Sequence, residues 1–81
     1  MGILTCIINP FWEKQLIKND YTNEELWVES NKVPEVLHSL LLEKTHPIKG
    51  IWLEGPYIEC ETIRYKYCNK YPEDNVPFTI N

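Results

Sequence analysis

The stretch Lys49–Tyr71, KGIWLEGPYIECETIRYKYCNKY, decides the fold of this chain. Three consecutive large apolar residues in Ile48–Glu54 predict a buried strand. Gly55 and Pro56 then predict a two-residue corner, because proline is tolerated where a helix begins. A helix is expected from there to about Asn69. A strand that leads into a helix in this way is half of a βαβ unit, so the stretch predicts an α/β fold.

The apolar run predicts that this strand has partners on both faces, as a parallel strand between two helix layers has. We also expect Trp52 in the core. On the helix, one face is predicted to carry the core residues, which are Cys60, Ile63, Tyr67 and Tyr71. Cys68 flanks them and is predicted to be a small core residue as well.

The other elements are predicted on both sides of this stretch. Strands are expected at Gly2–Asn9, Phe11–Ile17, Glu24–Glu29 and Val76–Ile80. A helix is expected from an N-cap at Ser30-Asn31 to about Lys44, with apolar residues at helical spacing at Val33, Val36, Leu37, Leu40 and Leu41. The first strand is expected to be central and covered on both faces, and Pro77 favours an edge position for the last.

The fold class is therefore α/β (α+β), a small mixed sheet in the order β-β-β-α-β-α-β with two helices. Right-handed crossovers would make the first, fourth and fifth strands parallel neighbours and leave the second and third as an antiparallel wing. With 81 residues, a single domain over residues 1–81 is expected.

Composition narrows the classes of function. The net charge is −4 with Arg64 as the only arginine, so direct nucleic-acid binding is not expected. Three cysteines cannot all pair within one chain, and we see neither a secretory leader nor a membrane span, so a cytoplasmic protein is predicted. The absence of alanine beside abundant Ile, Asn, Lys and Glu is typical of AT-rich coding, as in a low-GC bacterium or its phages.

The element order resembles the ribonuclease-H-like fold. That resemblance implies two-metal catalysis by carboxylates, one on the first strand and one near the end of the fourth. Glu54 matches the second position, whereas Ile3–Asn9 contains no acid. The resemblance would therefore imply a noncatalytic member. A metal-dependent nuclease that uses Glu54 is the alternative, and a capping or solvated acid at the helix start is the plainer interpretation of Glu54.

No other motif predicts a cofactor or metal. His38 and His46 lie eight residues apart and no C-x-x-C pair exists, so the spacing of zinc ligands is absent. The three glycines lie too far apart for a phosphate-binding loop. We therefore expect no metal, cofactor or catalytic residue.

Aromatic residues carry the remaining signal. Phe11, Trp12, Lys14 and Lys18 interleave as in platforms that stack single-stranded nucleic acid, a second alternative, although packing explains them as well. Trp12 or Trp27 is expected at the surface. The second helix has more tyrosines than one small core can hold, so Tyr57 and Tyr65 are expected to be exposed beside Glu61.

These residues predict a noncatalytic protein-binding protein whose site comprises Glu54, Tyr57, Glu61, Tyr65 and Trp12. Size and residue usage resemble phage accessory proteins, anti-CRISPR proteins among them. The sharper hypothesis is therefore a phage-encoded inhibitor that blocks a host protein sterically inside the bacterial cytoplasm, with a nucleic-acid-binding defence complex as the candidate target. Because so small a core gains from a partner, a homodimer is also predicted.

Overall fold

A computed structural model describes residues 2–43, 48–73 and 76–81 of the chain. The elements run in the order β1 (Ile3–Ile7), β2 (Gln15–Asn19), β3 (Glu24–Val28), η1 (Ser30–Lys32, a single 3-10 turn), α1 (Val33–Leu41), β4 (Gly50–Glu54), α2 (Tyr57–Lys70) and β5 (Phe78–Ile80). The predicted order β-β-β-α-β-α-β is confirmed, with η1 added before the first helix.

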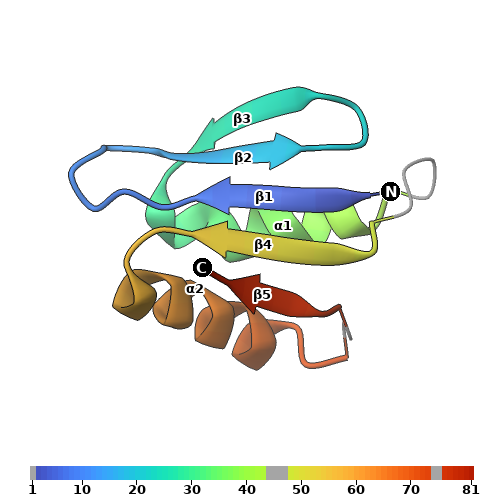
Figure 1. Cartoon of the computed structure of the whole chain (residues 1–81). Helices are drawn as coiled ribbons and strands as arrows, with labels where there is room; N and C mark the ends of the chain where they lie inside the picture. Colours follow the sequence, from blue (N-terminus) through green and yellow to red (C-terminus); the bar gives the residue numbers. More distant parts are fainter. Residues whose placement is uncertain (1, 44–47, 74–75) are drawn as a thin grey trace.

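The strands form one five-stranded sheet in the order β3-β2-β1-β4-β5 (Figure 1). β1 pairs with β4 and β4 with β5 in parallel, whereas β2 is antiparallel to both β1 and β3. The parallel trio, the antiparallel wing and the edge position of the last strand are therefore as predicted.

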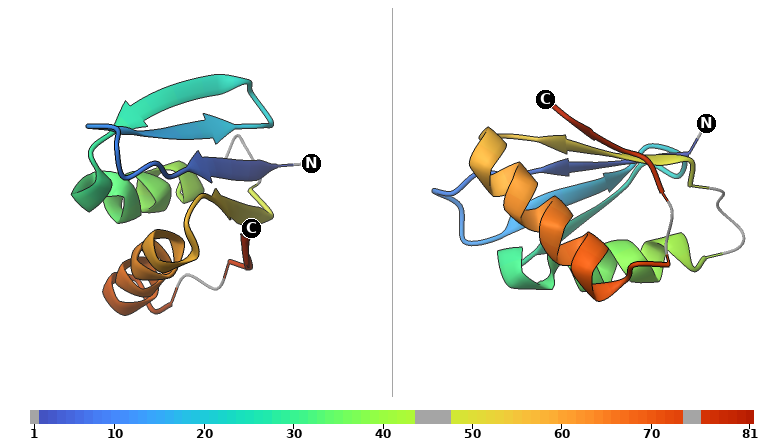
Figure 2. Two further views of the ribbon diagram at one scale, coloured as in Figure 1. Left: turned by 60° about the vertical axis from the view of Figure 1, so that its left-hand side comes forward. Right: turned by 90° about the horizontal axis from the view of Figure 1, so that it is seen from below.

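Both helices cover the same face of the sheet, as Figure 2 shows. The expectation that β1 and β4 are covered on both faces is therefore wrong. The reason is topological: the crossovers from β3 to β4 and from β4 to β5 step across the sheet in the same direction. Right-handed connections that step the same way must lie on one face. None of the helices in the described ranges lies on the other face, and we call it the open face.

The core lies between the sheet and the two helices. It is built by alternate strand residues and by the inner sides of the helices, namely Leu4, Cys6, Ile8, Ile17, Val33, Leu37, Ile51, Leu53, Cys60, Ile63 and Tyr67. The fully buried Tyr67 meets the ring of Phe78 edge-on, at 5.2 Å between centroids. Complete burial of one large apolar side chain contributes about 1.5–3 kcal/mol, so these few residues dominate the stability.

Trp52 does not belong to this core, contrary to prediction. Ile51 and Leu53 are buried under the helices, whereas Trp52 points to the open face and is only half-buried. Alternation along a strand explains the error, because of three consecutive residues the middle one must face away from the other two. Cys68 is likewise exposed rather than in the core, while Cys60 is buried as expected.

The helix bounds differ from prediction mainly at α1. Ser30 and Asn31 lie in η1 and cap nothing with their side chains; Lys32 holds the N-cap position. The predicted end at Lys44 lies outside the described residues, and α1 stops at Leu41. α2 starts after Pro56 and extends one residue beyond the predicted Asn69. Neither helix in the described ranges is long and apolar enough to cross a membrane.

Side chains of α1 contact the C-terminal end of α2 and the residue that follows it. The Lys70 ammonium donates to the Glu35 carboxylate at 2.7 Å. The His38 ring stacks on Tyr71 at 3.9 Å between centroids and 5° between planes. Tyr71 therefore packs against α1 and covers the buried side of α2 at its C-terminal end.

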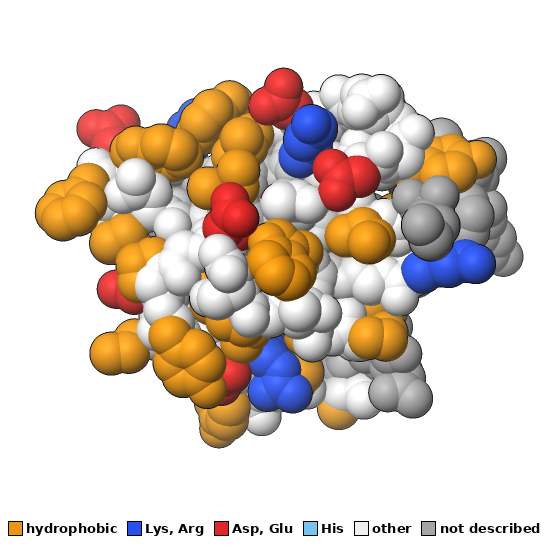
Figure 3. Space-filling model, in the orientation of Figure 1, with side chains coloured by type: hydrophobic (Ala, Val, Ile, Leu, Met, Phe, Trp, Pro, Cys, Tyr) orange, Lys and Arg blue, Asp and Glu red, His pale blue; other side chains and the backbone are white. Residues whose placement is uncertain are grey.

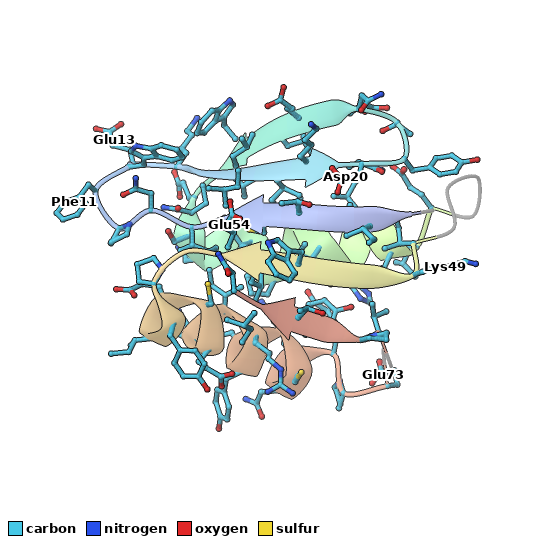
Figure 4. All side chains as sticks on the ribbon, in the orientation of Figure 1. Phe11, Glu13, Asp20, Lys49, Glu54 and Glu73 are labelled. Atoms are coloured by element: carbon cyan, nitrogen blue, oxygen red, sulfur yellow. The ribbon has the colours of Figure 1, made fainter. Side chains whose placement is uncertain are left out.

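The second strand begins later than predicted, at Gln15 instead of Phe11. Asn9, two residues after the end of β1, begins a turn: its side-chain oxygen accepts the Phe11 N–H at 2.9 Å, and its carbonyl accepts the Trp12 N–H at 3.1 Å. Residues 10–14 consequently form a loop that projects beyond the sheet, with Phe11 near its tip (Figure 4).

Candidate protein-binding surfaces

The outer side of α2 carries a row of exposed apolar side chains. Tyr57, Glu61 and Tyr65 are spaced four residues apart and share one face, with Ile58 and Thr62 beside them. Exposed fractions reach 65% for Tyr57, 76% for Ile58 and 69% for Tyr65. These five residues line a shallow groove of about 360 Å³, and we call them the α2 stripe. Tyr57 and Tyr65 are thus exposed, as predicted.

The corner before α2 fixes where the α2 stripe points. Gly55 adopts φ +149°, which is open to glycine and strained for other residues. A Cβ at Gly55 would collide with the carbonyl oxygen of Ile8. The Ile8 N–H donates to the Glu54 carbonyl at 2.7 Å, so β1 and β4 are held together here. With Cys60, Ile63 and Tyr67 buried beneath the helix, the α2 stripe is forced outward.

Glu54 lies on the open face, not on the α2 stripe (Figure 4). The cross-strand register aligns it in one row with Ile7, Leu16 and Trp27. The next row across the face consists of Glu25, Lys18, Thr5, Trp52 and Thr79. The neighbours of Glu54 in its cross-strand row are therefore apolar side chains, and none of them is an acid.

Trp12 belongs to a second aromatic group, at the end of the molecule formed by the β1–β2 loop. Its ring lies 5.5 Å from that of Trp27, with planes tilted by 59°. Phe11 is 93% exposed and joins both tryptophans around a shallow hollow of about 470 Å³. In Figure 3, hydrophobic side chains gather over this loop and the adjoining end of β3.

A buried amide holds the loop that carries Trp12. Gln15 is 1% exposed, and its side-chain oxygen accepts the Asn9 N–H. Its side-chain nitrogen donates to the carbonyls of Asn9 and Trp12, at 3.1 and 3.4 Å. Gln15 thus satisfies backbone groups that the sharp turn removes from the sheet ladder.

The structure divides the predicted site into separate groups. Tyr57, Glu61 and Tyr65 come together on α2, whereas Glu54 lies on the open face and Trp12 in the β1–β2 loop. Sequence reasoning missed Ile58, although its helical spacing to Thr62 and Tyr65 could have revealed it. It also missed the positioning role of Gln15, for which the alternation of Gln15, Ile17 and Asn19 as one inward face was the available signal.

The buried thiols do not provide a nucleophile. Burial raises the pKa of Cys6 to about 12, with a further contribution from nearby Cys60. Burial also raises the pKa of Cys60, and Glu59 and Glu61 add to that effect. A thiol must ionise to react, so both stay unreactive near neutral pH.

The carboxylates do not converge on a metal site within the described ranges. No group of three or more His, Cys, Asp or Glu residues there could hold an ion together. The β1 residue opposite Glu54 is Ile7. Because two-metal catalysis needs several carboxylates around the ions, the nuclease alternative lacks its ligands in this part of the chain.

The structure brings together three of the four residues of the predicted stacking platform for single-stranded nucleic acid. Phe11, Trp12 and Lys14 lie in the loop, while Lys18 is on the open face of β2 opposite Glu25. Trp12 packs on Trp27, and both Glu13 and Lys14 line their hollow. The aromatic residues therefore form a compact group with one acid and one lysine beside it, apart from Lys18.

Neither a protein-family model, nor a curated protein, nor a solved structure matches this chain.

Proposed function

We propose that this protein acts by binding another protein through the α2 stripe. The observation that carries the proposal is the exposure of Tyr57, Ile58 and Tyr65 around Glu61 on a rigid helix. Tyrosines on a rigid helix offer large contact areas at small entropic cost, and interface hot spots are enriched in them. Isolated exposed apolar residues need no explanation, but a groove formed by three of them does.

The chemistry of the stripe favours a partner with a basic surface. Glu61 lies in the middle of the stripe, and the chain carries a net charge of −4. Carboxylates rimmed by apolar side chains select cationic partners and speed their association. A protein surface that otherwise holds nucleic acid has this character, which fits occlusion of such a channel.

The test pairs a double variant with a matched control. Tyr57→Ala with Tyr65→Ala removes both rings from exposed helix positions where alanine is favourable, so the fold should persist. Asn69→Ala is the control, since Asn69 is exposed on α2 but outside the stripe. We expect a partner captured by the wild type and by Asn69→Ala, and at least a tenfold weaker dissociation constant for the double variant by calorimetry. Equal affinities would contradict the proposal.

The narrower proposal is a phage inhibitor of a bacterial defence complex. It rests on chain size, residue usage and the acidic aromatic stripe. Expression in a bacterium with active CRISPR immunity should restore plaque formation by a targeted phage, and the double variant should not. Unchanged immunity across defence types would remove this narrower version and leave the binding proposal to calorimetry.

A further inference from the structure

We propose that the open face binds a second copy of this chain, so that two sheets pack face to face with their strands antiparallel. This inference is independent of the α2 stripe, which lies on α2, away from the strands that form the open face. Three features of the open face are self-complementary, and they concern the ring of Trp52, the hollow beside it and the charges at the ends of β4.

The first two features are a projecting side chain and a hollow, which lie at neighbouring positions of β4. Trp52 stands on the open face, and two residues earlier Gly50 leaves that face without a side chain. The result is a hollow of about 240 Å³, whose lining includes Lys49 and Ile51 as well as Ile3, Gly50, Trp52, Pro77 and Thr79. A two-fold axis that crosses β4 between Gly50 and Trp52 would place the Trp52 ring of each copy in the hollow of the other.

The charges at the two ends of β4 obey the same symmetry. Lys49 precedes the strand and Glu54 ends it, both are exposed, and they lie at opposite ends of the ribbon in Figure 4. Neither forms an ion pair with another described residue. The same two-fold axis reverses the strand direction and brings Lys49 of each copy opposite Leu53 of the other. Glu54 is one residue further along, within reach of the long lysine side chain. Lys18 and Glu25 are cross-strand neighbours and offset one another, and Asp20 adds one acid to the face, where it accepts a hydrogen bond from Thr5.

The size of the open face suits a reversible pair. Strands of up to five residues at about 3.3 Å per residue, in a five-stranded sheet with about 4.8 Å between strands, give the sheet an area of roughly 400 Å². That is about half of what each partner buries in a standard interface, so we expect a dimer that dissociates on dilution. Aligned packing of two sheets is also a common way to cover such a face.

Sedimentation equilibrium over a concentration series tests the inference. We expect the wild type to reach twice the monomer mass and Gly50→Val to dissociate at least tenfold more readily. Valine favours strands, and a Cβ at Gly50 would meet Pro77 at an ordinary 3.5 Å, so the monomer should tolerate it. Trp52→Ala should act in the same direction. The Tyr57→Ala with Tyr65→Ala variant should dimerise as the wild type does, which separates this inference from the proposed function.

Charge reversal tests the orientation. Lys49→Glu and Glu54→Lys should each weaken the dimer, and the double variant should restore it, because the two charges are exchanged between copies. A monomer at all concentrations would overturn the inference. So would a dimer that is indifferent to Gly50→Val, a double variant that restores nothing, or a different protein held by the same face.

Discussion

At the scale of single residues, Gly55 is a position where only glycine fits. Its φ of +149° is strained for any other residue, and the Ile8 carbonyl oxygen occupies the space that a Cβ would need. We expect Gly55→Ala to lower the free energy of unfolding by about 2–4 kcal/mol, because strain and a backbone clash act together. Urea denaturation measures this.

The matched control is Gly50→Ala. Its Cβ would meet only the Pro77 carbonyl, at 3.5 Å, which is ordinary contact. At a protein concentration low enough for the chain to be monomeric, this variant should change the free energy of unfolding by less than about 1 kcal/mol. If the two alanine variants were equally stable, the corner would not constrain the fold as described.

The cysteines give a second prediction at this scale. In the folded protein, iodoacetamide at pH 8 should modify the exposed Cys68 and leave Cys6 and Cys60 intact until denaturant is added. Mass spectrometry of the intact protein counts the adducts. Because burial raises the pKa of Cys6 from 9.0 to about 12, its contribution to stability is full below pH 9 and is lost as pH rises toward 12. Rapid native labelling of all three cysteines would contradict this burial.

At the scale of elements, the Glu35–Lys70 pair joins α1 to α2. The hydrogen bond from Lys70 lowers the pKa of Glu35, and the same bond raises the pKa of Lys70. The Glu35 contribution is therefore present above about pH 4.5 and lost as pH falls below it, while that of Lys70 is lost as pH rises beyond 10.5.

Glu35→Gln should consequently lower the thermal midpoint slightly at neutral pH. Both partners are exposed and screened by solvent, so the shift should be much smaller than that of Gly55→Ala. The difference from wild type should shrink in high salt and vanish in acid below the folded pKa of Glu35. A difference that persisted there would show that the variant acts through packing.

Element order and strand pairing were predictable, because helical and alternating periods are written in the sequence and crossover handedness restricts the topology. The start of β2 was not predictable, because it depends on hydrogen bonds between Asn9, Gln15 and Trp12. No periodicity in the sequence indicates these bonds. At the candidate site, counting tyrosines located the exposed side of α2. The Trp12–Trp27 contact depends on that same loop and could not be foreseen.

At the scale of the whole molecule, coverage of the sheet was the main misjudgement. An apolar run shows that residues avoid water, but it does not say whether a helix or another molecule covers them. Ile51 and Leu53 are covered by helices, whereas Trp52 is covered by no described element. The fold therefore exposes the α2 stripe, the open face and the aromatic group of the β1–β2 loop with Phe11 and Trp12, on a molecule whose longest dimension is 33 Å.

The central position of β1 also has a consequence for synthesis. β1 pairs at once with β2, but its parallel partner begins at Gly50, after β2, β3 and α1 have been made. During synthesis on the ribosome, the edge of β1 that will pair with β4 therefore has unpaired backbone groups, although β1, β2 and β3 can already pair with one another. During that interval a foreign strand could occupy the place of β4, which makes early chaperone protection valuable to this small chain.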